Sequence, residues 1–574
     1  MRYALLLTVR LTAIAAFTAT PCFRPSTISN SRAMASQPND SYDVVVVGSG
    51  IGGLCCAAML ALYGSKVAVF ESHTHPGGAA HGFSIEKDGL KFQFDTGPSF
   101  FSGLNPDSPP KSSNPLRTVL DAIDERVECI PYTSFGLMFP EGEFVHTPEF
   151  DRNVLSQFGN AQAEWKSLMK LMEPLAATVA ALPTAALRAD IGVIKSAAPF
   201  LPKLILNPQP WNNLLLTQPY SEVLKQAGVK NTFLKNWIDL LCFCLSGLPA
   251  SGTISAEMAM MMGEFYEPDA IMDCPRSGAT SIVDALVRGL EKNGGDIFCR
   301  SHVDKIEVDE RGQAVGVVLR KNGQRIRAKK AVVSNMSIWD LLKSGVVDRK
   351  HFPASFLEER EDTPVGKSFM HLHVGFKASR EELAKLQAHY MFMKDWSLGV
   401  EAADNAVLLS IPSVHDESLA PPGFGVLHAY LPATEDFATW EGLDRKSIEY
   451  QQLKESRSAY LWSSIEKVIP DIRERVVVSR VGTPLTHQRF LRRYKGSYGP
   501  AIKAGEASFP FPGTPVKGLL LCGDSCFPGI GVPAVAGSGL LAANSVSLDS
   551  LEAQTDVLRK LRLREASSSF IRKQ

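Results

Sequence analysis

The sequence predicts an α/β protein: a Rossmann-like dinucleotide-binding domain with a mixed α+β substrate domain and a helical cap. Three observations predict this fold. A complete glycine-rich fingerprint stands between two buried strands near residue 50, short strands return over residues 275–335, and a second glycine-rich segment follows a strand near residue 525. The chain has 574 residues, too many for one compact core, which indicates more than one domain.

The first element is a β-branched run, Asp43–Val47, of the kind buried in a parallel sheet. A small-residue helix is expected over 54–63 and a second strand over 66–70, which ends on Glu71. Between the first strand and the helix stands a G-x-G-x-x-G pattern, made of Gly48, Ser49, Gly50, Ile51, Gly52 and Gly53. Strand, glycines, helix, strand and acid in this order predict a nucleotide site.

Each part of this unit has a mechanical role. Gly48 permits the tight turn, Gly50 lets the backbone approach a pyrophosphate, and Gly53 lets the helix pack closely on the strand. The helix N-terminus attracts the phosphate charge. Glu71 is placed to accept hydrogen bonds from the hydroxyls of the adenosine ribose.

A second glycine pair, Gly77 and Gly78, follows just beyond Glu71. It lets the backbone wrap a long flavin dinucleotide at a place where an NAD domain would continue into a helix, and this favours FAD. The segment 71–98 resembles the amine-oxidase-type flavoproteins, especially the phytoene desaturase and carotenoid isomerase branch. Many members carry arginine directly after the glycine pair, whereas this chain has Ala79, so the FAD contact of that arginine has no counterpart here.

Two later segments complete the predicted FAD domain. Short strands are expected within residues 275–335, the last two of them over 325–327 and 331–335. In this segment the resemblance implies that the backbone of Val303 pairs with the adenine. Near the C-terminus, a strand over 518–521 and a helix over 535–546 flank a loop that presents backbone N–H groups to a flavin edge. Its predicted FAD-binding residues are Gly523, Asp524, Gly531 and Val532, with Asp524 accepting a hydrogen bond from the ribityl chain.

The pattern over 529–534 also fits G-x-G-x-x-A, but no strand follows its helix, so a second nucleotide site is rejected. No NAD(P)H domain is therefore expected. The predicted division of the chain is a targeting leader, 1–40; a discontinuous FAD domain, 41–110, 270–345 and 505–550; a substrate domain with helical cap, 111–269 and 346–504; and a C-terminal helix or tail, 551–574.

Residues 157–265 combine apolar stretches with many prolines, and no stretch is long enough to span a membrane. Two interpretations stay open for this segment. It is a cap over a greasy substrate channel, in peripheral contact with a membrane, or it is ordinary domain core.

The first 39 residues contain no Asp or Glu, and an apolar run over 4–17 precedes a tail rich in Ser, Thr, Pro and Arg. These are processing signals, and they resemble the two-part leader of plastid proteins in algae with secondary plastids; a plain secretory signal is the alternative. Ten cysteines without a Cys-x-x-Cys favour buried thiols in a reducing compartment and predict no metal site. The formal net charge of zero gives no reason to expect a nucleic-acid partner.

His371 and His373 stand in a strand-like run, 370–374, and therefore project to the same face. They are the candidate catalytic residues if that face covers the flavin, where an imidazole shuttles a proton; satisfied structural histidines are the alternative. The strings 482–487, 497–500 and 522–529 are very similar to those of carotenoid cis–trans isomerases of plants and cyanobacteria.

This resemblance implies a polyene substrate and a cis-to-trans isomerisation with no net redox change, assisted by reduced FAD. The alternatives are a hydratase, a desaturase or a saturase of the same family, and a non-catalytic flavoprotein that binds pigment. The sequence does not select the carotenoid, the bond or the oligomeric state.

Overall fold

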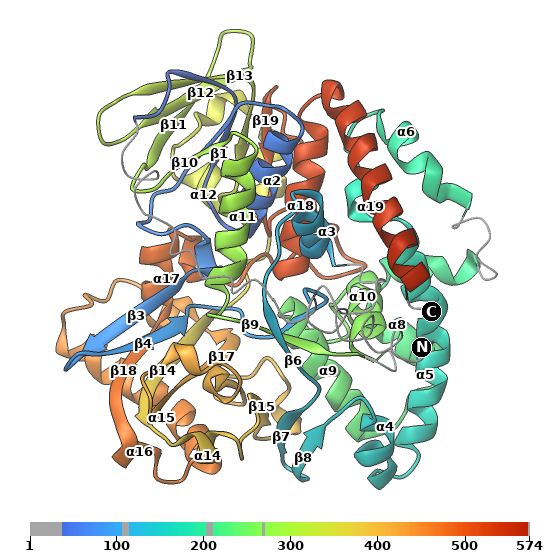
Figure 1. Ribbon diagram of the computed structural model, residues 1–574, viewed down its shortest axis with the longest axis vertical. Helices are drawn as coiled ribbons and strands as arrows, with labels where there is room; N and C mark the ends of the chain where they lie inside the picture. The colour runs from blue at the N-terminus through green and yellow to red at the C-terminus, as the bar shows by residue number, and fades with distance from the viewer. Residues whose placement is uncertain (1–36, 106–113, 203–209, 267–269, 572–574) are drawn as a thin grey trace, which may run out of the picture. The chain divides into compact units, whose positions relative to one another are not determined.

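The computed structural model describes residues 37–105, 114–202, 210–266 and 270–571, and the chain from Pro38 onward forms one compact unit. The predicted leader, 1–40, lies almost wholly outside the described residues, and the predicted domain boundaries stay a prediction. Two seven-stranded sheets dominate the fold, one in the upper and one in the lower part of Figure 1. A group of helices lies beside them.

The first sheet has the strand order β10-β2-β1-β13-β12-β11, with β19 also paired to β13. Its strands are β1 Ser41–Val47, β2 Val67–Phe70, β10 Asp296–Phe298, β11 Val303–Val308, β12 Ala314–Leu319, β13 Arg325–Ser334 and β19 Leu519–Leu521. Strands β10, β2, β1, β13 and β19 run parallel, whereas β12 and β11 are antiparallel additions. This is the predicted doubly covered sheet with β-branched strands buried on both faces.

Helices cover both faces of this sheet. On one face α2 (Ile51–Leu62) packs with α11 (Thr280–Lys292) and α18 (Val532–Ser545), and on the other lies α12 (Ile338–Lys343). Helices α2 and α18 come so close that a Cβ on Gly539 would lie 2.3 Å from the carbonyl oxygen of Gly52. The small residues of these two helices permit that contact, which fixes the first glycine-rich segment beside the second.

Two sequence predictions need correction. Both helices that follow a glycine segment start three residues before the predicted position, because the last residues of each glycine pattern already have helical hydrogen bonding. The strands expected separately over 325–327 and 331–335 are one strand, β13. Its first part pairs with β12 and its last part with β19, so a change of partner, and not a break, separates the two.

The second sheet has the order β18-β14-β17-β16-β15-β7-β8 and is antiparallel except between β15 and β7. Its strands are β7 Phe135–Phe139, β8 Gly142–His146, β14 Ser368–Lys377, β15 His389–Met393, β16 Ala406–Ser410, β17 Phe424–Glu435 and β18 Val476–Gly482. Helix α15 (Ile448–Val468) covers one face, against alternate residues of β14: Met370, Leu372, Val374 and Phe376. The residues between them therefore face the other way.

The predicted helical cap is present in residues 150–265, on the right of Figure 1. It contains α4 Phe150–Asn153, α5 Ala161–Ala181, α6 Val193–Ala197, α8 Tyr220–Gln226, α9 Thr232–Ser246 and α10 Ser255–Phe265. An apolar cluster around the fully buried Trp237 joins the cap to β7 and β15. No helix in the described part of the chain is long and apolar enough to cross a membrane.

Shorter elements complete the structure. The strands are a hairpin, β3 Gly82–Lys87 and β4 Leu90–Asp95, and a small sheet, β5 Phe101–Ser102, β6 Cys129–Tyr132 and β9 Met272–Pro275. The helices are α3 Pro115–Ala122, α13 Ala354–Glu361, α14 Arg380–Leu383, α16 Ile472–Arg475, α17 Pro484–Leu491 and α19 Leu551–Ile571. Of these, α17 matters most for function, because it lies between the two large sheets (Figure 1).

Candidate active site

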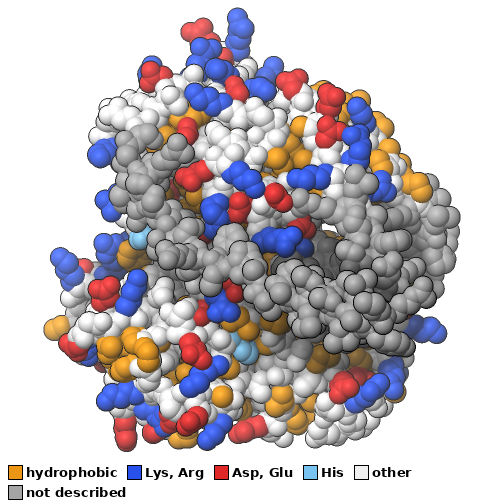
Figure 2. Space-filling view, viewed as in Figure 1, with side chains coloured by type: hydrophobic (Ala, Val, Ile, Leu, Met, Phe, Trp, Pro, Cys, Tyr) orange, Lys and Arg blue, Asp and Glu red, His pale blue; other side chains and the backbone are white. Residues whose placement is uncertain are grey.

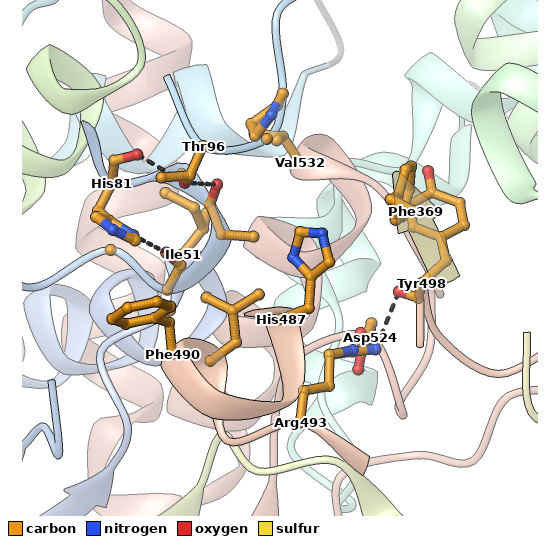
Figure 3. Close-up of a pocket in the computed structure, with 18 of the residues that line it drawn as sticks. Ile51, His81, Thr96, Phe369, His487, Phe490, Arg493, Tyr498, Asp524 and Val532 are labelled. Carbon is orange, nitrogen blue, oxygen red and sulfur yellow. Dashed lines mark hydrogen bonds and ion pairs between the residues drawn. The ribbon is translucent and has the colours of Figure 1, made fainter. Parts of the chain in front are cut away.

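A single cavity of about 1410 Å³ runs from the first sheet to the face of the second sheet that α15 does not cover. Figure 3 shows part of it, with Ile51 and Val532 on its glycine-rich side and Phe369 and Tyr498 on the opposite side. The cavity exceeds the roughly 300–1,000 Å³ of an ordinary small-molecule pocket. It has room for a dinucleotide and a second molecule.

The glycine fingerprint forms one wall of the cavity. The Gly48 amide donates to the Phe70 carbonyl at 2.9 Å, and the Gly77 amide donates to the Ser49 carbonyl at 2.9 Å. A Cβ on Gly78 would lie 3.0 Å from Cα of Gly50. The second glycine pair therefore folds directly onto the fingerprint, as predicted for a wrapped dinucleotide.

Glu71 is buried at the end of β2 and lines the cavity. Its Oε2 accepts hydrogen bonds from the backbone amide of Ser49 at 2.9 Å and from its hydroxyl at 2.6 Å, and its Oε1 accepts from the His73 amide at 2.7 Å. The Ser72 hydroxyl also lies 3.4 Å from Oε1, so each of the roughly four lone-pair sites of the carboxylate has a donor, and a ribose hydroxyl would replace one of these donors. These bonds fix the acid against the fingerprint.

Asn335, the residue after β13, joins the two glycine-rich segments. Its Nδ2 donates to the Cys522 carbonyl at 3.2 Å. A Cβ on Gly50 would lie 2.6 Å from its Oδ1, and a Cβ on Gly523 would lie 2.6 Å from its Nδ2. The backbone at both glycines is thus held against one amide side chain.

The second glycine-rich segment, residues 522–534, is the closing segment of the FAD-binding part and forms the opposite end of the dinucleotide wall. Gly531 and Val532 stand at the N-terminus of α18 and line the cavity. Asp524 forms an ion pair with Arg493, whose guanidinium also donates to the Tyr498 carbonyl at 3.0 Å (Figure 3). The carboxylate predicted to accept from the ribityl chain therefore already has a cationic partner, and its role toward the cofactor stays a prediction.

The structure brings the predicted site residues together. All but one line this cavity: Gly48, Ser49, Gly50, Ile51, Gly52, Glu71, Gly77, Gly78, Val303, His371, His373, Gly523, Asp524, Gly531 and Val532. Val303 is the first residue of β11 and its side chain is buried. The exception is Gly53, where a Cβ would lie 2.3 Å from the Gly48 carbonyl, which fits its predicted role in helix packing.

His371 and His373 are buried on the cavity face of β14, with ring centroids 5.9 Å apart. His428 on β17 lies behind them: its Nε2 is 2.6 Å from His371 Nδ1, and its other ring nitrogen has no partner among the described residues. His373 donates from Nε2 to the Asp95 carbonyl at 2.9 Å. His487 of α17 faces His371 at 4.7 Å between ring centroids.

These four imidazoles are neutral in the resting protein. Burial lowers the pKa of His373 and of His487 to about 4, and it lowers the pKa of His371 and His428 well below the ordinary range. The neighbouring imidazoles add repulsion. A cationic form therefore needs a negative charge placed nearby.

Ring nitrogens of His371, His373 and His428 lie within 4.8 Å of one another, close enough for a shared metal ion. However, the facing nitrogens of His371 and His428 are 2.6 Å apart and the two rings are within 17° of parallel. That is the arrangement of an in-line hydrogen bond, and not of lone pairs that converge on an ion.

Sequence reasoning missed four residues of this site, namely Asn335, His428, His487 and Arg493. Asn335 ends a strand that was recognised, and His487 ends the string 482–487 that was singled out for its resemblance. His428 had no such signal. It enters the site only through its pairing opposite His373 on the neighbouring strand.

The residues present fit FAD. The glycine contacts leave open backbone where a dinucleotide needs it, a buried acid stands at the ribose position, and the N-termini of α2 and α18 both face the cavity. The remaining part of the cavity is apolar, lined by side chains that include Leu241, Phe243, Met260, Phe265, Met391 and Leu408.

We predict stoichiometric, non-covalent FAD that Gly50→Val loses. The φ of −58° at Gly50 suits any L-residue, but a Cβ there would lie 2.6 Å from Oδ1 of Asn335, so this amide has to shift while the added valine fills the approach to the pyrophosphate. A thermal unfolding curve shows whether the variant is folded. Flavin released by denaturation and measured per protein should be near one in the wild type and near zero in the variant. Gly513→Ala, where a Cβ meets nothing within 4 Å, is the control. A folded Gly50→Val protein with full flavin would contradict the assignment.

The comparisons agree with this geometry. Residues 51–547 match the model of the flavin containing amine oxidoreductases. The chain is 31% identical over 541 residues to the chloroplastic prolycopene isomerase 1 of an Oncidium hybrid cultivar, covering 92% of this chain and 87% of that protein. It is 26% identical to the all-trans-retinol 13,14-reductase of Rattus norvegicus, covering 81% and 78%.

The fold also matches a solved structure, an oxidoreductase from Methanosarcina mazei, with a TM-score of 0.53 and 18% identity over 86% of this chain and 98% of that one. The fold that carries the predicted FAD-binding residues is thus one that is also found in a solved structure. The chain belongs to the flavin containing amine oxidoreductase family, and it is an enzyme whose cofactor is FAD.

Proposed function

We propose that this enzyme converts a cis carbon–carbon double bond of a carotenoid to trans, with no net redox change. One observation carries the proposal: a single cavity is lined by the glycine-rich dinucleotide wall, by apolar side chains and by the buried imidazoles of His371 and His373. The relatives named prolycopene isomerase support a carotenoid as the substrate.

The chain's own residues bind and orient the polyene. Apolar side chains of α9, α10 and β15 remove it from water, at about 25 cal/mol for each Å² of apolar surface buried. Phe369 and Tyr498 line the cavity and pack edge to face with ring centroids 5.1 Å apart, and the ring centroid of Phe369 lies 6.2 Å from that of His487 (Figure 3). Bound FAD, in its reduced form, supplies electron density that stabilises a positive charge on the polyene.

His371 and His373 are the proposed proton carriers. An imidazolium N–H gives its proton to one carbon of the double bond, which leaves a single bond and a delocalised cation. Rotation follows, and the neutral imidazole takes the proton back, so atoms and electrons balance. His428 supports His371 from behind, because a hydrogen bond to its Nδ1 fixes which nitrogen faces the cavity.

Saturation of a polyene bond is the second candidate, since the chain is also similar to the rat retinol reductase. That reaction consumes two electrons in each turnover, whereas isomerisation consumes none. Hydration would use the same cation but trap water, and desaturation would need an external acceptor.

We also propose peripheral contact with a plastid membrane. The cap exposes four large apolar side chains: Ile191 (73%), Ile194 (70%), Leu201 (46%) and Leu214 (69%). Figure 2 shows apolar side chains along the edge where Figure 1 has α6. Chloroplastic relatives support the compartment, and a fluorescent fusion of residues 1–45 that stays in the cytosol would argue against it.

The membrane contact predicts a charge effect. Ile191→Asp with Ile194→Asp should reduce flotation of the holoenzyme with lipid vesicles, because two carboxylates replace apolar side chains in the lipid contact. Ile448→Asp, at a side chain that is 77% exposed at the start of α15, is the matched control and should float like the wild type. Equal flotation of all three proteins would refute this surface.

The redox balance separates the candidate reactions. Chemically reduced, anaerobic holoenzyme with dispersed cis-carotenoid should turn over many times without consuming reductant, and product mass should equal substrate mass. Mass spectrometry measures the product mass, and a titration measures how much reductant is consumed for each turnover. A product heavier by two hydrogens indicates saturation, one heavier by water indicates hydration, and one lighter by two hydrogens indicates desaturation.

The proton carriers predict a pH profile. At saturating FAD, turnover should rise as the pH falls from 8 to 6, because the imidazolium fraction grows toward the lowered pKa of about 4 at His373. His371→Gln or His373→Gln should slow turnover by up to about 10²-fold, the scale of a lost general acid, with FAD content unchanged. His389→Gln, a buried histidine on β15 that does not line the cavity, is the control. Unchanged rates in both cavity variants would exclude these histidines as carriers.

A further inference from the structure

The segment after Glu71 holds three histidines where the relatives' pattern has an arginine. Position 79, directly after the glycine pair, is alanine, and His73, His75 and His81 lie around it. Their ring centroids are 4.9 Å apart for His73 and His81, 5.7 Å for His73 and His75, and 6.4 Å for His75 and His81. All three line the same cavity as the glycine fingerprint.

Hydrogen bonds tie this cluster to the dinucleotide wall. His81 Nδ1 lies 2.6 Å from the Gly78 carbonyl, which only accepts, so Nδ1 carries the hydrogen and Nε2 is left with a lone pair. His73 Nδ1 lies 3.2 Å from the His75 amide and 3.4 Å from the His75 carbonyl, so it accepts from the amide in one tautomer and donates to the carbonyl in the other. The backbone amide of His73 in turn donates to Glu71 at 2.7 Å.

The cluster has no carboxylate of its own to hold a positive charge. Burial lowers the pKa of His75 and His81, and the histidines lower it further by repelling one another. The hydrogen bond to the Gly78 carbonyl and the charge of Glu71 raise the pKa of His81, while Arg300 lowers the pKa of His75. The other charged groups around this part of the cavity are His302, Arg489 and Arg492, and α17 brings Phe490 to 5.9 Å from His73.

We propose that His73, His75 and His81 form a proton-dependent clamp for the pyrophosphate of FAD, in place of a fixed cation at position 79. The fingerprint and the second glycine pair place the pyrophosphate beside this cluster. On binding, the cluster takes up a proton, and the added imidazolium N–H donates to a phosphate oxygen. The clamp concerns the cofactor site alone and does not depend on which reaction the enzyme performs.

The direction of the pH dependence follows from the thermodynamic linkage between proton binding and FAD binding. The two negative charges of a pyrophosphate raise the pKa of His75 and of His81 above their lowered values in the free protein, so the complex binds more protons than the free protein. Affinity for FAD is then strongest below the free-protein pKa and weakens as the pH rises through the pKa of the complex. An arginine at position 79 would give no such dependence, because it stays charged throughout.

The test is FAD binding to the apoprotein, followed by flavin fluorescence at pH 6, 7 and 8. The dissociation constant should be smaller at pH 6 than at pH 8, by up to about tenfold if one imidazole gains one pKa unit on binding. Calorimetry in two buffers of different ionisation enthalpy should show net proton uptake on binding.

Two kinds of variant distinguish loss of the clamp from a general destabilisation of the protein. His73→Asn with His75→Asn and His81→Asn keeps polar atoms at the Nδ1 positions but removes all three titrating rings, and it should abolish proton uptake and flatten the pH dependence. Ala79→Arg should tighten binding at pH 8 and also flatten the dependence. His351→Asn, on the short helix at 349–351, is the control. Wild-type binding that is independent of pH, or proton uptake that persists in the triple variant, would overturn the proposal.

Discussion

The close approach of three backbone segments around one side chain is the constraint on which the site depends. The fingerprint, the end of β13 and the start of the closing segment meet at Asn335, where neither Gly50 nor Gly523 has room for a Cβ. Residues far apart in sequence are thereby held within hydrogen-bonding distance. Without this contact, the N-termini of α2 and α18 would not face one cavity, and the two ends of the flavin dinucleotide would have no common wall.

The second sheet supplies the candidate catalytic histidines, because side chains alternate between its two faces along β14. Even-numbered residues of β14 pack against α15, so His371 and His373 face the cavity. Burial lowers the pKa of both histidines, and in the proposed reaction this gives the cofactor a second role besides stabilising a positive charge on the polyene. A negative charge on the bound cofactor would raise the pKa of these histidines and so stabilise an imidazolium there. The same reasoning applies at the pyrophosphate end, where neutral histidines stand in for a permanent cation.

Much of the fold could be predicted from sequence because its signals are local. The fingerprint, the acid at Glu71 and the shared face of His371 and His373 each follow from spacing within a single strand or turn. The helix starts were placed late because glycines were taken as loop, although Gly52 and Gly53 are already helical. His428 and Arg493 could not be found this way: one depends on cross-strand register and the other on an ion pair across 31 residues.

The central claim is that one cavity holds the flavin and the polyene in contact. The most direct test is to titrate a carotenoid into anaerobic, reduced holoenzyme while recording the flavin absorption spectrum and, separately, the bound carotenoid. We expect a saturable change in the flavin spectrum with one carotenoid per protein and the same dissociation constant by both measures. Stoichiometric carotenoid binding that leaves the flavin spectrum unchanged would contradict the account.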